Sequence, residues 1–332
     1  MQTSLENFAI DFKKILTSSA IDTFPQTILS HELSTMSRKS LHLRKPLPQR
    51  ICEDYVIDCS VMIVYYNEKS KMRIFIVDAF ADSLFRGNPA AVCILDKDIS
   101  DELKQKIAAE MNLSETAFVL RQDNGFGLRW FTPVSEVELC GHATLASAHI
   151  LWREGILQEN EEAIFRTLQS GILRAGKTGD NIVLNFPSIV PQITEHENAV
   201  RSLFSNEPFY IGLAGNHFFV ELPSEEHVTE YKPDFTKISR LPKYGLIITS
   251  ASEGEFDFVS RFFAPAVGVN EDPVTGSAHC SLCTYWAGKL EKNKMRAYQA
   301  SKRGGVIGVE LKEDRVYLSG NAVTFLIGEI NV

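Results

Sequence analysis

Apolar residues recur with two different periods along the chain, and these periods predict where strands and helices lie. In most of the chain, β-branched and aromatic residues form short runs between Gly, Asn and Asp, which is the pattern of strands. Strands are expected at residues 73–80, 116–121, 127–131, 163–167 and 182–186, and again at 244–250, 257–263, 306–311, 315–319 and 322–327. The chain from Met72 to Val332 is therefore predicted to be mainly β-structure.

Three segments break the strand pattern and predict helices. Ser100 is a suitable N-cap for a helix over residues 101–111, whose apolar residues share one face as in an amphipathic surface helix. The segments that follow Gly141 and Gly276 are instead apolar almost all round, and a helix of that kind is buried on every side. The sequence thus predicts an α+β fold in which strands surround buried helices.

Three motifs occur twice in the same order, which indicates an internal duplication. The matched segments are Arg86–Leu95 with Ala214–Leu222, Arg129–Pro133 with Arg261–Pro265, and Gly141–Trp152 with Gly276–Trp286. The separation between matched residues grows slowly along the chain, as short loop insertions would make it. We therefore expect two pseudo-symmetric lobes, each a β-barrel-like sheet around a central buried helix, with a cleft between them.

The duplication also sets the domain boundaries. The first lobe is expected at residues 72–187 and the second at 188–322, and the C-terminal strand, residues 323–332, is a candidate to return to the first lobe. Residues 1–71 are rich in Ser, Thr and Leu and form an N-terminal extension that we expect to be poorly ordered. Its acidic residues argue against an organelle-targeting peptide, because such peptides contain few acids.

Composition and charge exclude several kinds of partner. The chain of 332 residues has a net charge of −8 and no dense run of Lys and Arg, so binding to nucleic acid is not expected. Its apolar stretches fall short of the roughly 20 residues of a membrane-spanning helix, so no membrane contact is expected either. The 6 cysteines are too scattered for a disulfide framework, which indicates a reducing compartment, the cytoplasm by default.

The two glycine-led helix starts are candidates for binding an anion. A helix N-terminus carries unpaired N–H groups and a partial positive charge, and glycine lets a ligand come close to the backbone. Gly141 and Gly276 hold equivalent places in the repeat. They either shape two loop-to-helix turns or together bind a small carboxylate-bearing molecule between the lobes.

Residues 270–286 contain several side chains that suggest chemistry at first sight. Ser277 lacks the Gly-x-Ser-x-Gly spacing of a hydrolase nucleophile. Cys280 and Cys283 lie on an apolar helix with no second Cys or His pair at zinc spacing, so we interpret them as small core residues and predict no metal site. Asp272 and the backbone of Gly276 and Ser277 remain as the useful groups.

In the first lobe, Glu115 stands at the entry to an apolar strand. It is either an exposed loop acid or a partly desolvated one, whose pKa rises towards neutrality and which can then exchange protons near pH 7. The pattern of residues leaves both readings open.

The assembled motifs resemble the PhzF family of phenazine biosynthesis, which has the diaminopimelate-epimerase-like fold. The resemblance covers Met72 to Val332 through DAFADSLFRGNPAAVCIL, NLSETAFVL, RWFTPVSEVELCGHAT and RFFAPAVGVNEDPVTGSAH. It implies two lobes, each a strand barrel around a central helix, an active site between them, and no metal or organic cofactor. Animal phenazine-biosynthesis-like domain-containing proteins are similar in the ELCGHAT motif.

The resemblance also implies roles for single residues. The glutamate at the position of Glu115 moves a proton between carbons of a small cyclic amino acid, dihydro-hydroxyanthranilate, and so isomerises it. His142, Asp272 and Ser277 are expected to contact or orient the substrate. The backbones of Gly141 and Gly276 are expected to bind its carboxylate. The implied activity is a cofactor-independent isomerase.

One departure from the related epimerases bears on this expectation. Those enzymes use two cysteines, one before each helix glycine, whereas this chain has Cys140 and Thr275 there. A symmetric two-thiol racemase is therefore not expected, because one face of the substrate would lack its base. Cys140 is a bystander, a packed thiol or an auxiliary base. Two alternatives stay open, an epimerase that uses Cys140 with Glu115 and a non-catalytic binding or regulatory protein. A homodimer is compatible with all of these readings.

Overall fold

The computed structural model of the chain describes residues 55–57, 64–66, 71–243 and 245–332. The chain divides into two units, residues 1–69 and 70–332. In the first unit, strand β1 (Tyr55–Ile57) pairs antiparallel with strand β2 (Val64–Tyr66). The expectations for residues 1–71, poor order and no targeting signal, fall almost wholly outside the described residues.

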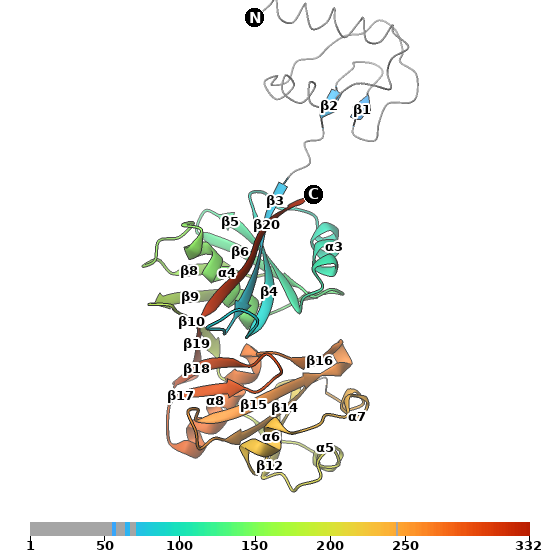
Figure 1. Ribbon diagram of the computed structural model, residues 1–332, viewed down its shortest axis with the longest axis vertical. Helices are drawn as coiled ribbons and strands as arrows, with labels where there is room; N and C mark the ends of the chain where they lie inside the picture. Colours follow the sequence, from blue (N-terminus) through green and yellow to red (C-terminus); the bar gives the residue numbers. More distant parts are fainter. Residues whose placement is uncertain (1–54, 58–63, 67–70, 244) are drawn as a thin grey trace, which may run out of the picture. The chain divides into compact units, whose positions relative to one another are not determined.

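The first lobe of the second unit is a curved sheet that surrounds helix α4 (Gly141–Arg153), as Figure 1 shows. Its strands lie in the order β20–β3–β4–β5–β6–β8–β9–β10. Their bounds are β3 Lys71–Ala79, β4 Asn88–Leu95, β5 Glu115–Gln122, β6 Gly125–Phe131, β8 Ala163–Arg166, β9 Ile172–Thr178, β10 Asn181–Pro187 and β20 Ala322–Asn331. The short strand β7 (Glu136–Val137) pairs with β6, and helix α3 (Asp101–Met111) covers the outer face.

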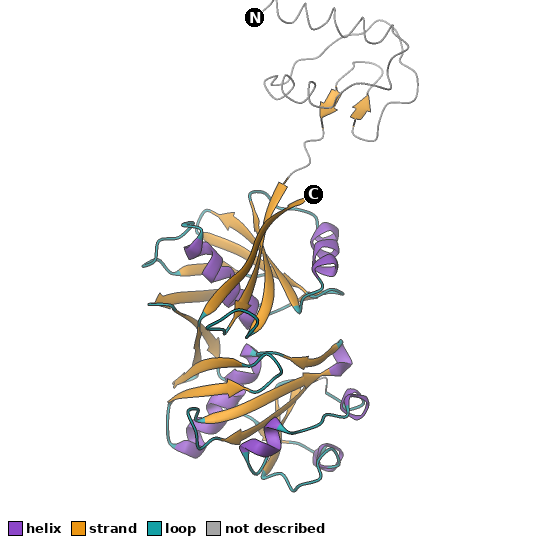
Figure 2. Ribbon diagram, viewed as in Figure 1, coloured by secondary structure: helices purple, strands orange, loops and turns teal. Residues whose placement is uncertain are grey.

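The second lobe repeats this plan around helix α8 (Gly276–Leu290), seen as the second central helix in Figure 2. Its strands lie in the order β11–β12–β13–β14–β15–β17–β18–β19, with β16 beside β15. Their bounds are β11 Gln192–Ile193, β12 Tyr210–Ala214, β13 His217–Glu221, β14 Gly245–Ala251, β15 Phe258–Ala264, β16 Val269–Asp272, β17 Lys294–Gln299, β18 Gly305–Lys312 and β19 Arg315–Gly320. The remaining elements are α5 Glu197–Arg201, α6 Glu225–Thr229, α7 Phe235–Ser239 and the 3-10 turn η2 Pro265–Val267.

The two lobes share one topology, which confirms the predicted duplicated α+β fold. Parallel pairs occur at matching places, β4 with β5 and β13 with β14, then β6 with β8 and β15 with β17. The last strands of the two repeats, β10 and β19, pair antiparallel with each other and join the two sheets. Strand β20 pairs with β3 of the first lobe, just as β11 pairs with β12 of the second.

Small side chains explain how α4 and α8 fit inside their sheets. In α4, the stretch from Ala143 to Ala148 is Ala, Ser, Thr and Leu, and every one of these residues is buried. In α8, Cys280 and Cys283 are buried as free thiols, which confirms their interpretation as core residues. Both helices belong to one continuous hydrophobic cluster, while separate clusters lie beneath α3 and beneath α5 to α7.

Most predicted elements lie where the sequence placed them. Helix α3 has the predicted bounds, and the Ser100 hydroxyl accepts a hydrogen bond from the Leu103 N–H as a cap. The sequence missed β9, β12, β13 and β17 as well as β4. The Pro and Ala residues of β4 are weak strand formers, and pairing with β3 and β5 rather than local preference makes it a strand. Within the described residues, no helix combines the length and apolar character needed to cross a membrane.

One of the three repeat matches is wrong by one residue. The match paired Val92 with Val220, but Val92 packs around the central helices whereas Val220 packs in the cluster on the outer face. Alternate residues of a strand face opposite sides, so an odd shift reverses the face. The match of Arg129 with Arg261 is correct, since each guanidinium lies over the Phe ring two residues later, at 5.2 and 4.9 Å.

Candidate active site

The starts of the two central helices meet where the lobes join. A Cβ atom added to Gly141 would lie 3.4 Å from the Cα of Gly276, and one added to Gly276 would lie equally near the Cα of Gly141. A side chain at either position would therefore meet the other backbone at the near limit of van der Waals contact. The positive ends of two helices therefore come together, which favours a negatively charged group beside them.

Glu115 begins β5 and lies against the first turn of α4. Its Oε2 atom is 3.2 Å from Nε2 of His142, and only 18% of its side chain is exposed. Burial and, to a smaller extent, the nearby charge of Asp272 raise the pKa of Glu115 to about 8, against a hydrogen bond from the Cys140 thiol that lowers it. Glu115 is therefore the desolvated acid of the two readings that the sequence left open.

His142 is neutral, because burial lowers its pKa to about 3. Its Nδ1 atom lies 3.3 Å from the side-chain nitrogen of Asn88 and 3.4 Å from Sγ of Cys140. The amide nitrogen can only donate and the protonated thiol is a donor too, so Nδ1 is the acceptor of the ring. The ring proton is then on Nε2, the atom nearest the Glu115 carboxyl group.

Asp272 ends β16 and enters the site from the second lobe. Its Oδ1 atom accepts a hydrogen bond of 2.9 Å from Asn88, and its Oδ2 atom accepts one from the Thr275 hydroxyl. Burial raises the pKa of Asp272 to about 6, and Glu271 adds to the rise, while both hydrogen bonds oppose it. Near pH 7 Glu115 is therefore mostly protonated, and Asp272 is mostly charged.

Asn88 connects the two halves of the site, although the sequence did not single it out. It begins β4 in the first lobe, is fully buried, and also donates a hydrogen bond of 2.9 Å to the carbonyl oxygen of Val274 in the second lobe. The only signal in the sequence was the Gly87-Asn88 pair within a repeat. An amide side chain is too common to mark a site without these long-range contacts.

Cys140 is the N-cap residue of α4 and is buried. Burial and the Glu115 charge raise the pKa of its thiol well above the usual range, which disfavours the thiolate. Glu115, Cys140 and His142 offer three kinds of metal ligand within 4.8 Å of one another. The sequence predicted no metal site, and this stays a prediction, because one nitrogen of His142 lies near both other ligand atoms.

The structure places the remaining predicted residues around this cluster. Ser277 is exposed in the first turn of α8, directly after Gly276. Glu115, Cys140, His142 and Asp272 come together, with Gly141 and Gly276 at the two helix starts. Their roles towards a substrate remain predictions.

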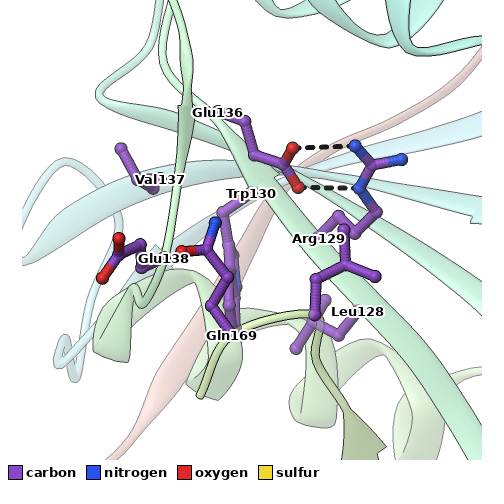
Figure 3. A pocket seen from close by; sticks show the side chains of 8 residues that line it. Leu128, Arg129, Trp130, Glu136, Val137, Glu138 and Gln169 are labelled. Atoms are coloured by element: carbon purple, nitrogen blue, oxygen red, sulfur yellow. Dashed lines mark hydrogen bonds and ion pairs between the residues drawn. The ribbon is translucent and has the colours of Figure 1, made fainter. Parts of the chain in front are cut away.

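Two hollows in the described chain lie away from this cluster. The smaller, about 10 Å³, has room for about one water molecule. It lies next to the ion pair between Arg129 and Glu136, which Figure 3 shows. The larger, about 490 Å³, lies in the first lobe between α4, the β9–β10 hairpin and the start of β20. Neither hollow is lined by the residues predicted to act.

Comparison with known proteins shows the family of the chain. Residues 77–328 match the family described as phenazine biosynthesis-like protein. An uncharacterized isomerase of Halalkalibacterium halodurans is 50% identical over 259 residues, which cover 77% of this chain and 97% of that protein. The human phenazine biosynthesis-like domain-containing protein is 42% identical and is covered to 99%, over 78% of this chain.

Solved structures extend the likeness to the fold. A phenazine biosynthesis protein of the PhzF family from Enterococcus faecalis has a TM-score of 0.75 and 40% identity, over 79% of this chain and 100% of that one. A probable proline racemase from Agrobacterium radiobacter, at 10% identity and a TM-score of 0.54, shows the same fold alone. The class is that of isomerases with the diaminopimelate-epimerase-like fold. Within it, this chain belongs to the PhzC-PhzF family.

Proposed function

We propose that the protein is a cofactor-independent isomerase that moves a proton between carbons of a small carboxylate-bearing substrate. The substrate is amino-acid-like and cyclic, and Glu115 is the general acid and base. The observation that carries the proposal is the pairing of a desolvated Glu115, pKa about 8, with the charged Asp272 at the junction of two helix starts.

Each part of the site has a task in this reaction. The backbone N–H groups that follow Gly141 and Gly276 bind the substrate carboxylate. Asp272, ionised near pH 7, binds an amino group, and Ser277 supplies a hydroxyl at the rim. His142 Nε2 lies 3.2 Å from the Glu115 carboxyl group without forming a hydrogen bond in the free protein, and it is placed to stabilise the carboxylate once Glu115 has given up its proton.

The proton shift then needs a single group. Protonated Glu115 gives its proton to one carbon of an unsaturated substrate, and the resulting carboxylate removes a proton from another carbon. The double bond moves, and the total number of protons on the substrate is unchanged. Because Glu115 is half protonated near pH 8, it can act in both directions at neutral pH.

The test is solvent deuterium incorporation, measured by mass spectrometry, into a panel of cyclic amino and hydroxy acids in heavy water. We expect the wild type to label one compound at carbon, with a bell-shaped pH dependence bounded near 6 and 8. Glu115→Gln should abolish labelling while binding persists, and Glu110→Gln, on the exposed face of α3, is the matched control. A Glu115→Gln protein that labels at the full rate would exclude this mechanism.

Cys140→Ser separates this proposal from an epimerase with Cys140 and Glu115 as opposite bases. The Cys140 thiol lies 3.4 Å from Nδ1 of His142, and a serine hydroxyl could still donate there. We therefore expect labelling to be reduced but not lost. Complete loss with ligand binding intact would favour the two-base epimerase. Binding of a panel compound without labelling by any variant would favour a binding protein.

A further inference from the structure

Gln299, at the end of β17, lies outside every motif considered so far and is completely buried. Its Oε1 atom accepts a hydrogen bond of 2.8 Å from the Thr275 N–H. Its Nε2 atom donates to the carbonyl oxygen of Asp272 at 2.7 Å and to the Thr275 hydroxyl oxygen at 3.2 Å. One amide side chain thus holds both ends of the 272–275 loop, which carries Asp272 to the site.

The orientation of this amide is fixed by its surroundings. If the oxygen and nitrogen were exchanged, the nitrogen would face the Thr275 N–H and the oxygen would face the Asp272 carbonyl, so two donors and two acceptors would oppose each other. Gln299 therefore donates to the Thr275 hydroxyl oxygen. That contact occupies an acceptor position of the hydroxyl, and the hydroxyl proton is left to point at Oδ2 of Asp272.

The first lobe has no counterpart of this arrangement. The strand register pairs Phe126 with Phe165 and Phe258 with Ala297, so Thr167 holds the place of Gln299. The Thr167 hydroxyl donates to the carbonyl oxygen of Gly171 in the next turn instead. The amide is therefore a feature of the second half of the site, the half in which Thr275 stands where the first half has a cysteine.

We propose that Gln299 is a positioning residue that directs the Thr275 hydroxyl towards Asp272 and so holds the Asp272 carboxylate ionised and oriented in the site. A role of Gln299 in catalysis rests on the proposed function. Its effect on the Asp272 carboxylate, however, can be measured in the free protein. A hydrogen bond to a charged group is stronger than one between neutral groups, so its loss should be measurable.

The groups that face Asp272 come from several elements. Asn88 donates to it from β4, and Thr275 donates to it from the start of α8. The charge that acts against its ionisation is that of Glu271 beside it on β16, whereas Glu115 on β5 is protonated, and so neutral, in the pH range where Asp272 titrates. A variant at Gln299 changes none of these charges, so a shift in the titration of Asp272 reports the hydrogen bonds alone.

The experiment is a titration of the Asp272 carboxyl carbon by NMR in the free protein, with carbon-13-labelled aspartate and Asp272→Asn to assign the signal. Gln299→Met keeps the volume and removes the polarity, and we expect it to raise the pKa of Asp272 by about one unit, a tenfold change in the proton equilibrium. Thr275→Val removes the relaying hydroxyl and should raise it by at least as much. The control is Gln105→Met, because Gln105 donates to the Thr132 carbonyl oxygen, outside the site.

A double variant with both Gln299→Met and Thr275→Val tests whether Gln299 acts through Thr275 or only disturbs the structure around Asp272. If Gln299 acts through Thr275, Gln299→Met should add little to the shift of Thr275→Val. Two additive shifts, or a Gln299→Met protein with the wild-type titration, would overturn the proposal. Should Gln299→Met fail to fold, Gln299→Asn, which moves the amide back by one methylene, takes its place in the cycle.

This titration is independent of the isomerase proposal. If the wild type labels no compound in heavy water but Asp272 shifts as expected, the proposed function fails and the role of Gln299 stands. If the wild type labels a compound but the pKa of Asp272 is unchanged in Gln299→Met, the proposed function stands and the role of Gln299 fails. Where labelling occurs, the acidic limb of its pH dependence should move up with the pKa of Asp272 in Gln299→Met.

Discussion

Glu115 connects the chemistry of the site with the stability of the fold. Its ordinary pKa is 4.5, and in the folded protein burial raises it to about 8. Between these two values the folded protein binds a proton that the unfolded chain has released. The stability that this provides is complete below pH 4.5 and is lost as the pH rises through about 8.

Glu115→Gln should therefore stabilise the protein at high pH. At pH 9 the wild type must keep a buried carboxylate charged, and the variant does not. We expect the free energy of unfolding of the variant to exceed that of the wild type by roughly 1–3 kcal/mol at pH 9, and by much less at pH 5. Urea unfolding at the two pH values measures this, and an equal difference at both would contradict the assignment of the raised pKa to Glu115.

Single residues also mark the limit of what the sequence could predict. The pattern of residues identified Glu115 and Asp272, and the resemblance to the PhzF family added His142. The pattern could not decide whether Glu115 is exposed, since that depends on the packing of β5 against the first turn of α4. It missed Asn88 and Gln299 altogether, because an amide acquires its role only from partners that the fold brings to it.

Elements were predicted well where their own composition decides their structure. Helices α4 and α8 were identified by apolar residues on all sides, and α3 by its cap and its single apolar face. The Gly-Asn match failed because it compared letters, whereas equivalence between strands is set by their pairing. Gly215 lies in the tight turn between β12 and β13, while Gly87 ends a longer loop between β3 and β4.

The two glycines of α8 allow a test of the close approach between helix starts. A methyl group on Gly276 would lie 3.4 Å from the Gly141 Cα and 3.5 Å from Cδ1 of Leu318, whereas nothing lies within 4 Å of one on Gly288. Gly276→Ala should not raise the free energy of unfolding, because the methyl group would meet the Gly141 backbone at the near limit of van der Waals contact. Gly288→Ala should raise it by about 0.5–1 kcal/mol, because alanine loses less backbone entropy in a helix. Thermal unfolding of both variants measures the contrast, and stabilisation by both would contradict a tight contact at the junction.

At the scale of the whole molecule, the lobes are also held together by an ion pair beside the site. Arg303, in the turn after β17, donates at 2.7 Å to the buried carboxylate of Asp78 on β3 and at 2.8 Å to the carbonyl oxygen of Gly87. The Phe85 N–H donates to the other oxygen of Asp78. Asn88, which reaches Asp272, follows directly on this anchored loop.

Arg303→Met should destabilise the protein, because it leaves the Asp78 carboxylate buried without its cation. We expect a loss of about 3 kcal/mol in the free energy of unfolding, measured in urea. Asp78→Asn in the same chain should restore part of that loss, since no buried charge is then left unpaired. Lys302→Met, at the exposed neighbouring position, is the control. If Arg303→Met and Lys302→Met lowered the free energy of unfolding equally, the ion pair would contribute nothing to stability.

The paths of β11 and β20 bear on the connectivity of the chain. Each follows the last strand of its own repeat and completes the sheet of the other lobe. If the link between the repeats were cut, the two halves would be two subunits that exchange their C-terminal strands. The chain therefore has the connectivity of a strand-swapped dimer fused into one polypeptide, and its pseudo-two-fold axis passes between the two helix starts, so each half of the site comes from a different repeat.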